Sequence, residues 1–240
     1  MTQSAAATVR LALLPLALAG AGEARAQDVP AEPCRLELTG DTTVEWRGLY
    51  GRGYEVAAQE QEYETLSVTV RHEGAPCEYY LVAAPLSSGA DNVLIGAGDR
   101  LAWDLQSSPS GPTLLSRDFL GSLSTQLPGR FEGEAGAQQL PLFFTIPPGQ
   151  FVRGGHYHGT FVLRLFRKGD GAPELVSELP VSAIAPVPAI LQVRSDDFPG
   201  RSREISVDFG DLNTPAAKSI GFDIVSNTTV AVDFVSATGG

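Results

Sequence analysis

The sequence predicts an all-β protein built on the immunoglobulin-like β-sandwich, with one complete domain followed by a truncated second copy. Three observations support this fold class. After residue 26, apolar residues recur at alternate positions in short runs, which is typical of antiparallel strands, and helical periodicity is almost absent. The 17 prolines and 26 glycines supply turns between these runs. Part of the pattern recurs near the C-terminus, which indicates a second copy.

Residues 1–26 have the features of a secretory signal peptide. Arg10 precedes an apolar run from Leu11 to Ala21, and Ala24-Arg25-Ala26 places small residues where a signal peptidase reads the chain. The run is too short to cross a bilayer, which takes about 20 residues. We therefore expect cleavage before Gln27 and export through the periplasm to the cell surface.

Export provides an oxidising setting for the two cysteines. Cys34 and Cys77 both follow the signal peptide, and we expect them to form a disulfide. A metal site built on this pair would need further ligands, and none is spaced for it in the sequence. The formal net charge of −11 argues against nucleic acid and anionic lipid as partners. No metal and no cofactor are expected.

The first domain is predicted over residues 27–185. Its alternating runs are Cys34–Leu38, Thr65–Val70, Tyr79–Ala83, Arg100–Leu105, Leu140–Ile146 and Thr160–Phe166. A polar turn at Arg167–Pro173 separates the last of these runs from a further strand at Glu174–Ala185. The two strands predict a hairpin whose second strand completes the sandwich in cis. Pro186 and Pro188 then mark a domain boundary.

The second domain, residues 186–240, is predicted from a partial repeat. Leu66–Val70 matches Ile220–Ile224, and upstream Val44–Trp46 matches Val207–Phe209. The second copy ends well before the first one does, and an immunoglobulin-like sandwich takes about 100 residues. We therefore expect the second sandwich to be cut short.

No catalytic motif is present, and the protein is not expected to be an enzyme. A nucleophile elbow, a phosphate loop and a Rossmann glycine pattern are all missing. His156 and His158 place two imidazoles on one face of a strand, but no third ligand is near in the sequence, so an exposed strand start is favoured over a metal site. Asp196-Asp197 is not followed by further acidic residues at the regular spacing of the ligands in a calcium-binding loop. Asn227 is interpreted as a turn residue.

Apolar residues in three predicted loops of the first domain are the candidate binding site. They are Leu49, Tyr50 and Tyr54, then Val93, Leu94 and Ile95, then Leu114 and Leu115 with Phe119 and Leu120. A single apolar loop residue is more often packed into the core than exposed. Three such loops in one domain, however, favour a contact patch on the surface.

Several short motifs resemble those of the spore coat protein U-like domain, which builds the archaic class of chaperone–usher pili. Ile146-Pro-Pro-Gly-Gln150 and Gly155-His-Tyr157, followed by the strand Thr160–Phe166, resemble the closing motif of this domain. Val207-Asp-Phe-Gly210 and Phe222-Asp-Ile224 resemble the opening half of a second copy. In order and spacing the resemblance covers nearly all of the chain after the signal peptide.

The resemblance implies assembly by strand exchange. Subunits of that family are incomplete sandwiches, and a periplasmic chaperone supplies the missing strand before assembly at an outer-membrane usher. A neighbouring pilin subunit then supplies it in the fibre. Residues 27–33 contain two prolines and one large apolar side chain, a composition unsuited to a donor strand, which favours a place at the end of the fibre.

The function implied is that of a fimbrial tip subunit, resembling a two-domain tip adhesin. Its first domain would attach to a surface, and its second would join a chaperone–usher pilus by donor-strand complementation. In some tip subunits of the family, apolar loops at the domain end grip surfaces. The alternative is a secreted structural coat or matrix protein of the same fold without a dedicated receptor. Neighbouring genes for a chaperone and an usher would favour the tip subunit.

Overall fold

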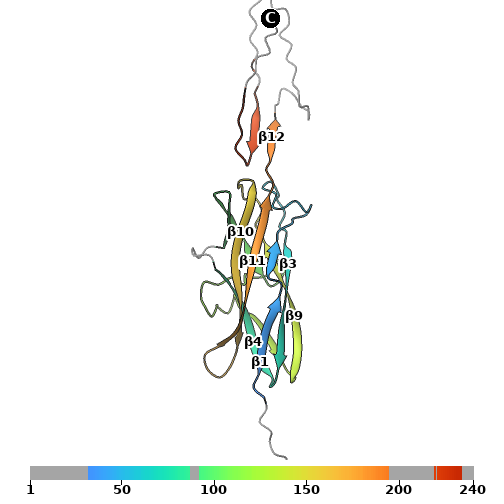
Figure 1. Ribbon diagram of the computed structural model, residues 1–240, viewed down its shortest axis with the longest axis vertical. Coiled ribbons are helices and arrows are strands. Elements are labelled where there is room, and N and C mark those ends of the chain that lie inside the picture. Colours follow the sequence, from blue (N-terminus) through green and yellow to red (C-terminus); the bar gives the residue numbers. More distant parts are fainter. Residues whose placement is uncertain (1–31, 87–91, 195–218, 220, 234–240) are drawn as a thin grey trace, which may run out of the picture. The chain divides into compact units, whose positions relative to one another are not determined.

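The computed structural model describes residues 32–86, 92–194, 219 and 221–233 (Figure 1). The predicted signal peptide and most of the predicted second domain, including residues 207–210, lie outside the described residues. In the described part of the chain no helix is long and apolar enough to cross a membrane. Two β-sheets pack face to face as an immunoglobulin-like sandwich, which confirms the predicted fold class.

The sandwich has eleven described strands, which are divided between its two sheets. They are β1 (Arg35–Gly40), β2 (Thr43–Glu45), β3 (Glu64–Glu73), β4 (Cys77–Pro85), β5 (Val93–Gly96), β6 (Asp99–Ala102), β7 (Asp104–Gln106), β8 (Leu127–Phe131), β9 (Ala135–Thr145), β10 (Gly155–Arg167) and β11 (Glu174–Val187). One sheet has the order β1-β3-β9-β7 and the other the order β2-β11-β10-β4-β8, with β5 pairing with β10 and β6. A separate ribbon is formed by β12 (Leu191–Arg194) and β13 (Asp223–Ser226).

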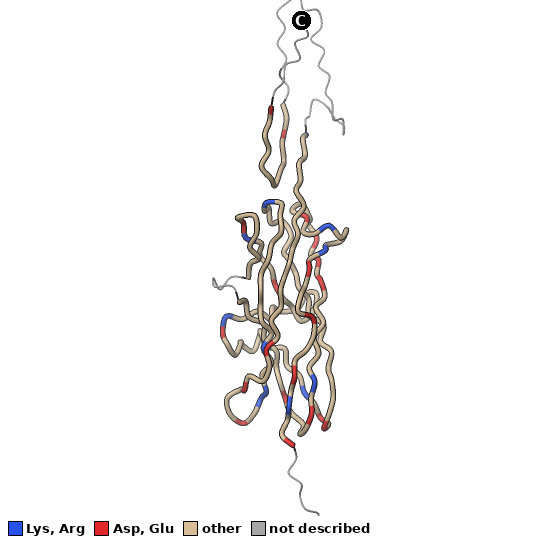
Figure 2. The backbone as a smooth tube through the Cα atoms, in the orientation of Figure 1, with Lys and Arg blue, Asp and Glu red and all other residues tan. Residues whose placement is uncertain are grey.

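The core forms because alternate residues of each strand face the opposite sheet. In β3, Leu66, Val68 and Val70 are fully buried, and Leu81 of β4 and Leu163 of β10 meet them from the other layer. Burying each such side chain contributes about 1.5–3 kcal/mol. Charged residues are interspersed around this core, and Figure 2 shows acidic and basic positions mixed along the described strands and turns.

The predicted strand at residues 100–105 is two strands that belong to different sheets. β6 pairs with β5, whereas β7 pairs with β9. Trp103 lies between them with 3% of its surface exposed, and its ring centroid is 5.3 Å from that of Phe144 and 5.0 Å from that of Phe161. The indole therefore packs between rings of both layers, and the chain changes sheets at this residue.

The last strand of the sandwich, β11, comes from the same chain. It pairs with β10 from Gly155↔Val187 to Arg167↔Glu174, and in parallel with β2 at Ser182–Ile184. The predicted hairpin is present, although its second strand continues to Val187. Because β11 has a hydrogen-bonded neighbour on each side, the chain completes this sheet in cis.

The β10-containing sheet also carries an apolar cluster on its outer face. Tyr80, Val82 and Phe166 are buried there, apart from the main core. The loop between β7 and β8 covers them, and Phe119 packs edge-on against Phe166 at 5.5 Å between ring centroids. Gly121 has a φ of 69°, and a Cβ there would lie 2.8 Å from Val82. β4 is thus buried on both faces, which explains its continuous apolar run.

Asn227 connects the ribbon to the end of the sandwich. Its side chain is nearly buried and forms two hydrogen bonds with the linker after β11: Nδ2 donates to the Pro188 carbonyl at 2.9 Å, and Oδ1 accepts from the Ile190 amide at 2.7 Å. The Asn227 carbonyl accepts from the Gly154 amide at 2.9 Å. Asn227 follows β13, as the predicted turn residue should, and in addition organises the linker.

Candidate functional site

The predicted contact residues divide into exposed and buried groups. The exposed fraction is 67% for Leu49, 65% for Tyr50, 50% for Ile95 and 51% for Phe119. It is 0% for Leu94, 2% for Leu114 and 7% for Leu115, and Val93 is intermediate. Only the first group can reach a partner without unfolding.

The prediction that Tyr54, Leu94, Leu114 and Leu115 form part of a surface patch is corrected, because all four belong to the core, Tyr54 with 2% of its surface exposed. Leu94 lies in β5 opposite Leu101 of β6, and its side chain points inward. Leu114 forms backbone hydrogen bonds with strands β4 and β7. The Leu114 carbonyl accepts from the Ala83 amide at 3.1 Å, and the Leu114 amide donates to the Leu105 carbonyl at 2.7 Å. The sequence around these residues predicts loops, but in the fold they form the backbone pairing of strand residues.

Leu49 and Tyr50 lie in a loop between β2 and β3 that two carboxylates hold in shape. Glu64 accepts from the Arg47 amide at 2.8 Å, and Glu62 accepts from the Leu49 amide at 2.8 Å. The Arg52 guanidinium lies 5.4 Å from the centroid of the Tyr50 ring. The two exposed apolar side chains are therefore presented by an ordered loop, which lowers the entropy cost of a contact.

Phe119 belongs to a second exposed apolar surface, which also includes Leu120 and Leu123. Leu123 is 92% exposed. The Arg164 guanidinium lies 4.6 Å from the centroid of the Phe119 ring, and the same ring packs edge-on against Phe166. Sequence reasoning included Leu120 in this loop but omitted Leu123, although the run from Phe119 to Leu123 places three large apolar residues among small ones.

The two exposed loops do not form one patch. The loop with Leu49 lies beside Pro186, whose carbonyl accepts from the Tyr54 amide at 2.8 Å, and Pro186 pairs with His156 near the start of β10. Phe119 packs on Phe166, near the other end of β10. Ile95 lies opposite His158 on the neighbouring strand β5.

The β12–β13 ribbon is the third exposed apolar surface. In its register Leu191 lies opposite Ser226 and Val193 opposite Ile224, so these apolar side chains share one face. Their exposed fractions are 56% for Leu191, 58% for Val193 and 44% for Ile224. No described strand packs over this face. In sequence the same alternation resembles that of the buried strands of the sandwich.

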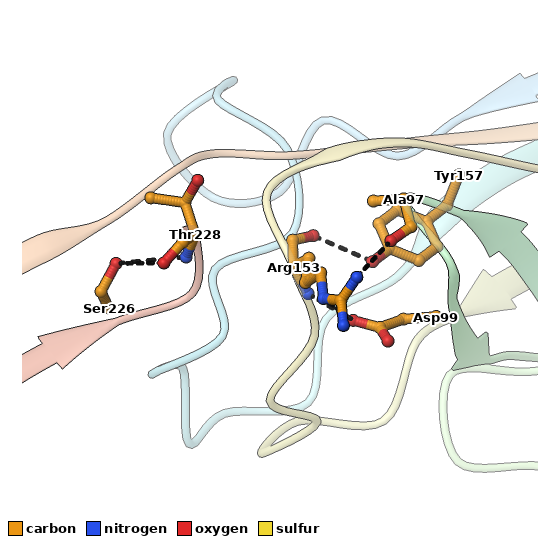
Figure 3. Close-up of polar contacts among 6 residues, drawn as sticks. All are labelled: Ala97, Asp99, Arg153, Tyr157, Ser226 and Thr228. Atoms are coloured by element: carbon orange, nitrogen blue, oxygen red, sulfur yellow. Dashed lines mark hydrogen bonds and ion pairs between the residues drawn. The ribbon is translucent and has the colours of Figure 1, made fainter. Parts of the chain in front are cut away.

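A hollow of about 420 Å³ lies where the ribbon meets the sandwich, lined by Asp99, Phe151–Arg153 and Ser226–Thr229. Figure 3 shows its polar contacts. The Asp99 carboxylate accepts from the Arg153 amide at 2.9 Å and lies 3.8 Å from the Arg153 guanidinium. Ser226 Oγ accepts from the Thr228 amide and donates to its carbonyl, both at 3.1 Å. These bonds fix the loops around the hollow.

Tyr157 forms a corner of the kind found in immunoglobulin-like folds. Its ring is fully buried near the start of β10, and its hydroxyl donates to the Arg153 carbonyl at 2.9 Å (Figure 3). Burial raises the pKa of the Tyr157 hydroxyl above its ordinary value, and the nearby Asp99 charge adds to the rise, against smaller opposing effects of Arg153. The tyrosine of the family-like motif thus has a structural role.

The other half of that motif also has a structural role. The Gln150 side chain forms two hydrogen bonds with the backbone of Ala102. Gln150 Oε1 accepts from the Ala102 amide at 2.7 Å, and Gln150 Nε2 donates to the Ala102 carbonyl at 2.9 Å. The Tyr54 hydroxyl donates to the Pro147 carbonyl at 3.1 Å and accepts from the Gln150 amide at 2.8 Å. The motif therefore closes this end of the sandwich.

The predicted disulfide between Cys34 and Cys77 is present. It connects the residue before β1 in one sheet to the first residue of β4 in the other. His72 of β3 lies beside it, and a ring nitrogen of His72 and the two sulfur atoms lie within 4.8 Å of one another. Sequence reasoning missed His72, although it precedes Cys77 by only five residues, because only the fold brings it close to Cys34 as well. It does continue the inward-facing series Leu66, Val68 and Val70, which was the available signal.

Comparison with known proteins gives structural similarities only, since no family model and no curated protein matches the chain. The CooA pilin subunit of enterotoxigenic Escherichia coli is 13% identical, with 64% of this chain and 99% of that chain covered and a TM-score of 0.42. A PapD-like domain of human CEP192 is also 13% identical, with coverages of 64% and 84% and a TM-score of 0.34. The CsuC–CsuE chaperone–tip adhesion subunit complex of Acinetobacter baumannii Csu pili is 16% identical, with coverages of 69% and 64% and a TM-score of 0.31. Scores and identities this low carry no conclusion about function.

Proposed function

We propose that the protein is the tip subunit of a chaperone–usher fimbria, which attaches to a surface through its first sandwich and joins the fibre through its second domain. The observation that carries the proposal is a contrast within the chain. The first sandwich is completed by its own strand β11, whereas the β12–β13 ribbon exposes an apolar face.

A sandwich completed in cis needs no partner in order to fold. One edge of β11 pairs with β10 along its length, and the other edge pairs with β2 at Ser182–Ile184. A strand supplied by another chain could not extend along the whole of that second edge without displacing β2, and this would cost the ladder that β2 and β11 already form. Such a module can stand at the end of a fibre and be free to bind.

The ribbon has the opposite character. Leu191, Val193 and Ile224 present an apolar face to solvent, a feature that favours association with further strands. In the proposed assembly a periplasmic chaperone supplies a strand to the second domain, the usher exports the complex, and a neighbouring pilin subunit replaces the chaperone.

Attachment is assigned to the two exposed loops of the first sandwich. Leu49 and Tyr50 form one contact, and Phe119, Leu120 and Leu123 form the other. Each square ångström of apolar area removed from water contributes about 25 cal/mol, so a surface without hydrogen-bonding groups can be held by such side chains. The remaining predicted contact residues, Val93 and Ile95, lie in β5 and are kept as secondary candidates.

The first experiment compares residues 27–187 alone with the full chain. We expect the fragment to be a soluble monomer with a cooperative thermal transition, measured by sedimentation and circular dichroism. The full chain should instead need a co-expressed archaic fimbrial chaperone to stay monomeric. A fragment that is soluble only with the chaperone would make the first sandwich an acceptor domain and overturn the proposal.

The second experiment measures attachment of cells that display the subunit on their fimbriae. Phe119→Asp with Leu123→Asp, and separately Leu49→Asp with Tyr50→Asp, should reduce attachment to an apolar surface. Leu86→Asp is the matched control, because Leu86 is 51% exposed and lies outside both loops. Fibres that assemble normally but keep full attachment in both double variants would favour the structural coat or matrix protein.

A further inference from the structure

The disulfide lies beside a buried histidine with one nitrogen that lacks a partner. His72 is 2% exposed, and its ring stacks on Phe131 at 4.7 Å between centroids. His72 Nε2 lies 2.8 Å from the Ala75 carbonyl oxygen. Because a carbonyl only accepts, Nε2 carries a proton. Nδ1 has no hydrogen-bond partner in the described part of the protein.

An unpartnered buried nitrogen calls for an explanation, because such a group costs about 1–3 kcal/mol. Two sulfur atoms lie close to the imidazole, since a ring nitrogen and the Sγ atoms of Cys34 and Cys77 are within 4.8 Å of one another. Two thiolates and an imidazole are the donors that Zn²⁺ and Cu⁺ prefer. The Nε2 bond to the Ala75 carbonyl is the contact that typically orients a metal-binding histidine.

We propose that, before the disulfide forms, Cys34, Cys77 and His72 bind one thiophilic metal ion of the zinc class through two thiolates and Nδ1. Both cysteines are thiols in the newly synthesised chain. Binding exchanges two S–H protons for two metal–sulfur bonds and releases those protons to solvent, with no transfer of electrons. Disulfide formation by exchange with an oxidising protein disulfide passes two electrons and two protons from the same sulfur atoms to that disulfide, which becomes a dithiol, so metal binding and oxidation exclude each other.

The backbone holds the three ligands together independently of the disulfide. The Ala75 amide donates to the Glu32 carbonyl at 2.8 Å, and the Gly74 amide donates to the Glu134 carbonyl at 2.7 Å. Gly74 has a φ of 93°, and a Cβ there would lie 2.3 Å from the Pro33 carbonyl oxygen. The segment that leads into Cys34 is therefore packed against the turn that separates His72 from Cys77.

The spacing of the ligands suits a single ion. The Cα atoms of the two cysteines are 6.2 Å apart. With metal–sulfur bonds of about 2.3 Å, two sulfurs of a tetrahedral site lie about 3.8 Å apart, which side-chain rotation can provide. A hollow of about 340 Å³ is lined by Cys77 and Phe131, among others, so it leads to one of the two sulfur ligands and to the ring on which His72 stacks.

The test uses the full chain with Co²⁺ as a spectroscopic probe and Zn²⁺ as its competitor. A phosphine and one water molecule reduce the disulfide: the phosphine takes up the oxygen of the water to become a phosphine oxide, and the two protons of the water convert the sulfurs to thiols. The reduced chain should bind one Co²⁺ with thiolate charge-transfer absorption that Zn²⁺ abolishes, and the oxidised chain should not. His72→Phe keeps an aromatic ring on Phe131 but removes the nitrogen, and should weaken binding about tenfold or more.

The matched control is the double variant His156→Ala, His158→Ala, which removes the other two of the chain's 3 histidines. It should bind as tightly as the unmodified chain. Equal Co²⁺ affinity of the reduced and oxidised chains, or unchanged affinity in a folded His72→Phe variant, overturns the proposal. If His72→Phe does not fold, X-ray absorption of the reduced, Zn²⁺-loaded control variant decides. Two sulfurs with an imidazole support the site, and a shell without imidazole overturns it.

Discussion

The sandwich and the β12–β13 ribbon are made of similar residues but leave them in opposite environments. In β3, Leu66, Val68 and Val70 alternate with polar residues and are fully buried. In the ribbon, Leu191 and Val193 alternate with polar residues in the same way and are more than half exposed. The difference shows that alternation defines an apolar face, whereas burial requires a second layer. The predictions below test how independent the two regions are.

The largest contrast is expected between matched pairs of charged substitutions. Leu94→Asp with Leu115→Asp places two carboxylates in the core and should prevent folding. Removal of one buried leucine side chain lowers the free energy of unfolding by about 2–5 kcal/mol, and burial of an unpaired charge lowers it further. Leu191→Asp with Val193→Asp should change the free energy of unfolding of the sandwich by less than about 0.5 kcal/mol. Thermal unfolding by circular dichroism measures both. Equal destabilisation by the two pairs would mean that the ribbon is part of the folding unit.

Removal of the disulfide should have the next largest effect, and only on the sandwich. The Cys34→Ser, Cys77→Ser variant opens a loop with a sequence separation of 43, which should cost about 4 kcal/mol through the entropy of the unfolded chain. Urea titration in a metal-free buffer gives the free energy of unfolding. A loss below about 1 kcal/mol would indicate that the contacts of the Gly74 turn hold the segment without the cross-link.

Substitution of Asn227 should separate the two regions. Asn227→Ala removes the bonds to Pro188 and Ile190 and should cost about 1–3 kcal/mol locally. Hydrogen exchange should accelerate at the Ile190 and Gly154 amides, while the amides of β3 remain protected. Thr229→Ala serves as the control, since Thr229 is exposed and takes no part in the bonds to Pro188 and Ile190. Unchanged exchange at Ile190 would contradict the role assigned to Asn227.

The smallest effect is expected at alkaline pH and is confined to the sandwich. Burial raises the pKa of the Tyr54, Tyr79, Tyr80 and Tyr157 hydroxyls above the ordinary 10.0. The folded protein therefore retains protons that the unfolded chain releases, so this contribution to stability is complete below the unfolded pKa and is lost as pH rises through the folded values.

Urea titrations below and above that pKa should show the free energy of unfolding falling with pH. Tyr157→Phe should reduce the slope and cost about 1 kcal/mol at neutral pH through its lost hydrogen bond. Tyr50→Phe is the control, since Tyr50 is exposed. A slope identical in both variants would show that the Tyr157 hydroxyl does not contribute.

Structural features that depend on a local sequence pattern could be predicted from the sequence. The hairpin of β10 and β11 followed from alternating strands around a polar turn, and the disulfide from two cysteines in an exported chain. The burial of Leu94 and Leu115 could not be predicted, because it depends on pairing with distant strands. Trp103 was placed inside one strand because a change of sheet leaves no local signal. His72 was missed because only the fold brings it to Cys34.

The parallel and antiparallel neighbours of β11 have a consequence for mechanics. A pull applied at the linker after Val187 acts along β11, and the hydrogen bonds to β10 lie across that direction over the register from Val187 to Glu174. A load in this direction is shared by many of the β10–β11 hydrogen bonds at once, so these bonds do not break one after another. If the protein anchors a cell against flow, the strand that completes the fold would also be the one that bears the tension. Resistance to rupture would then depend on the length of this ladder.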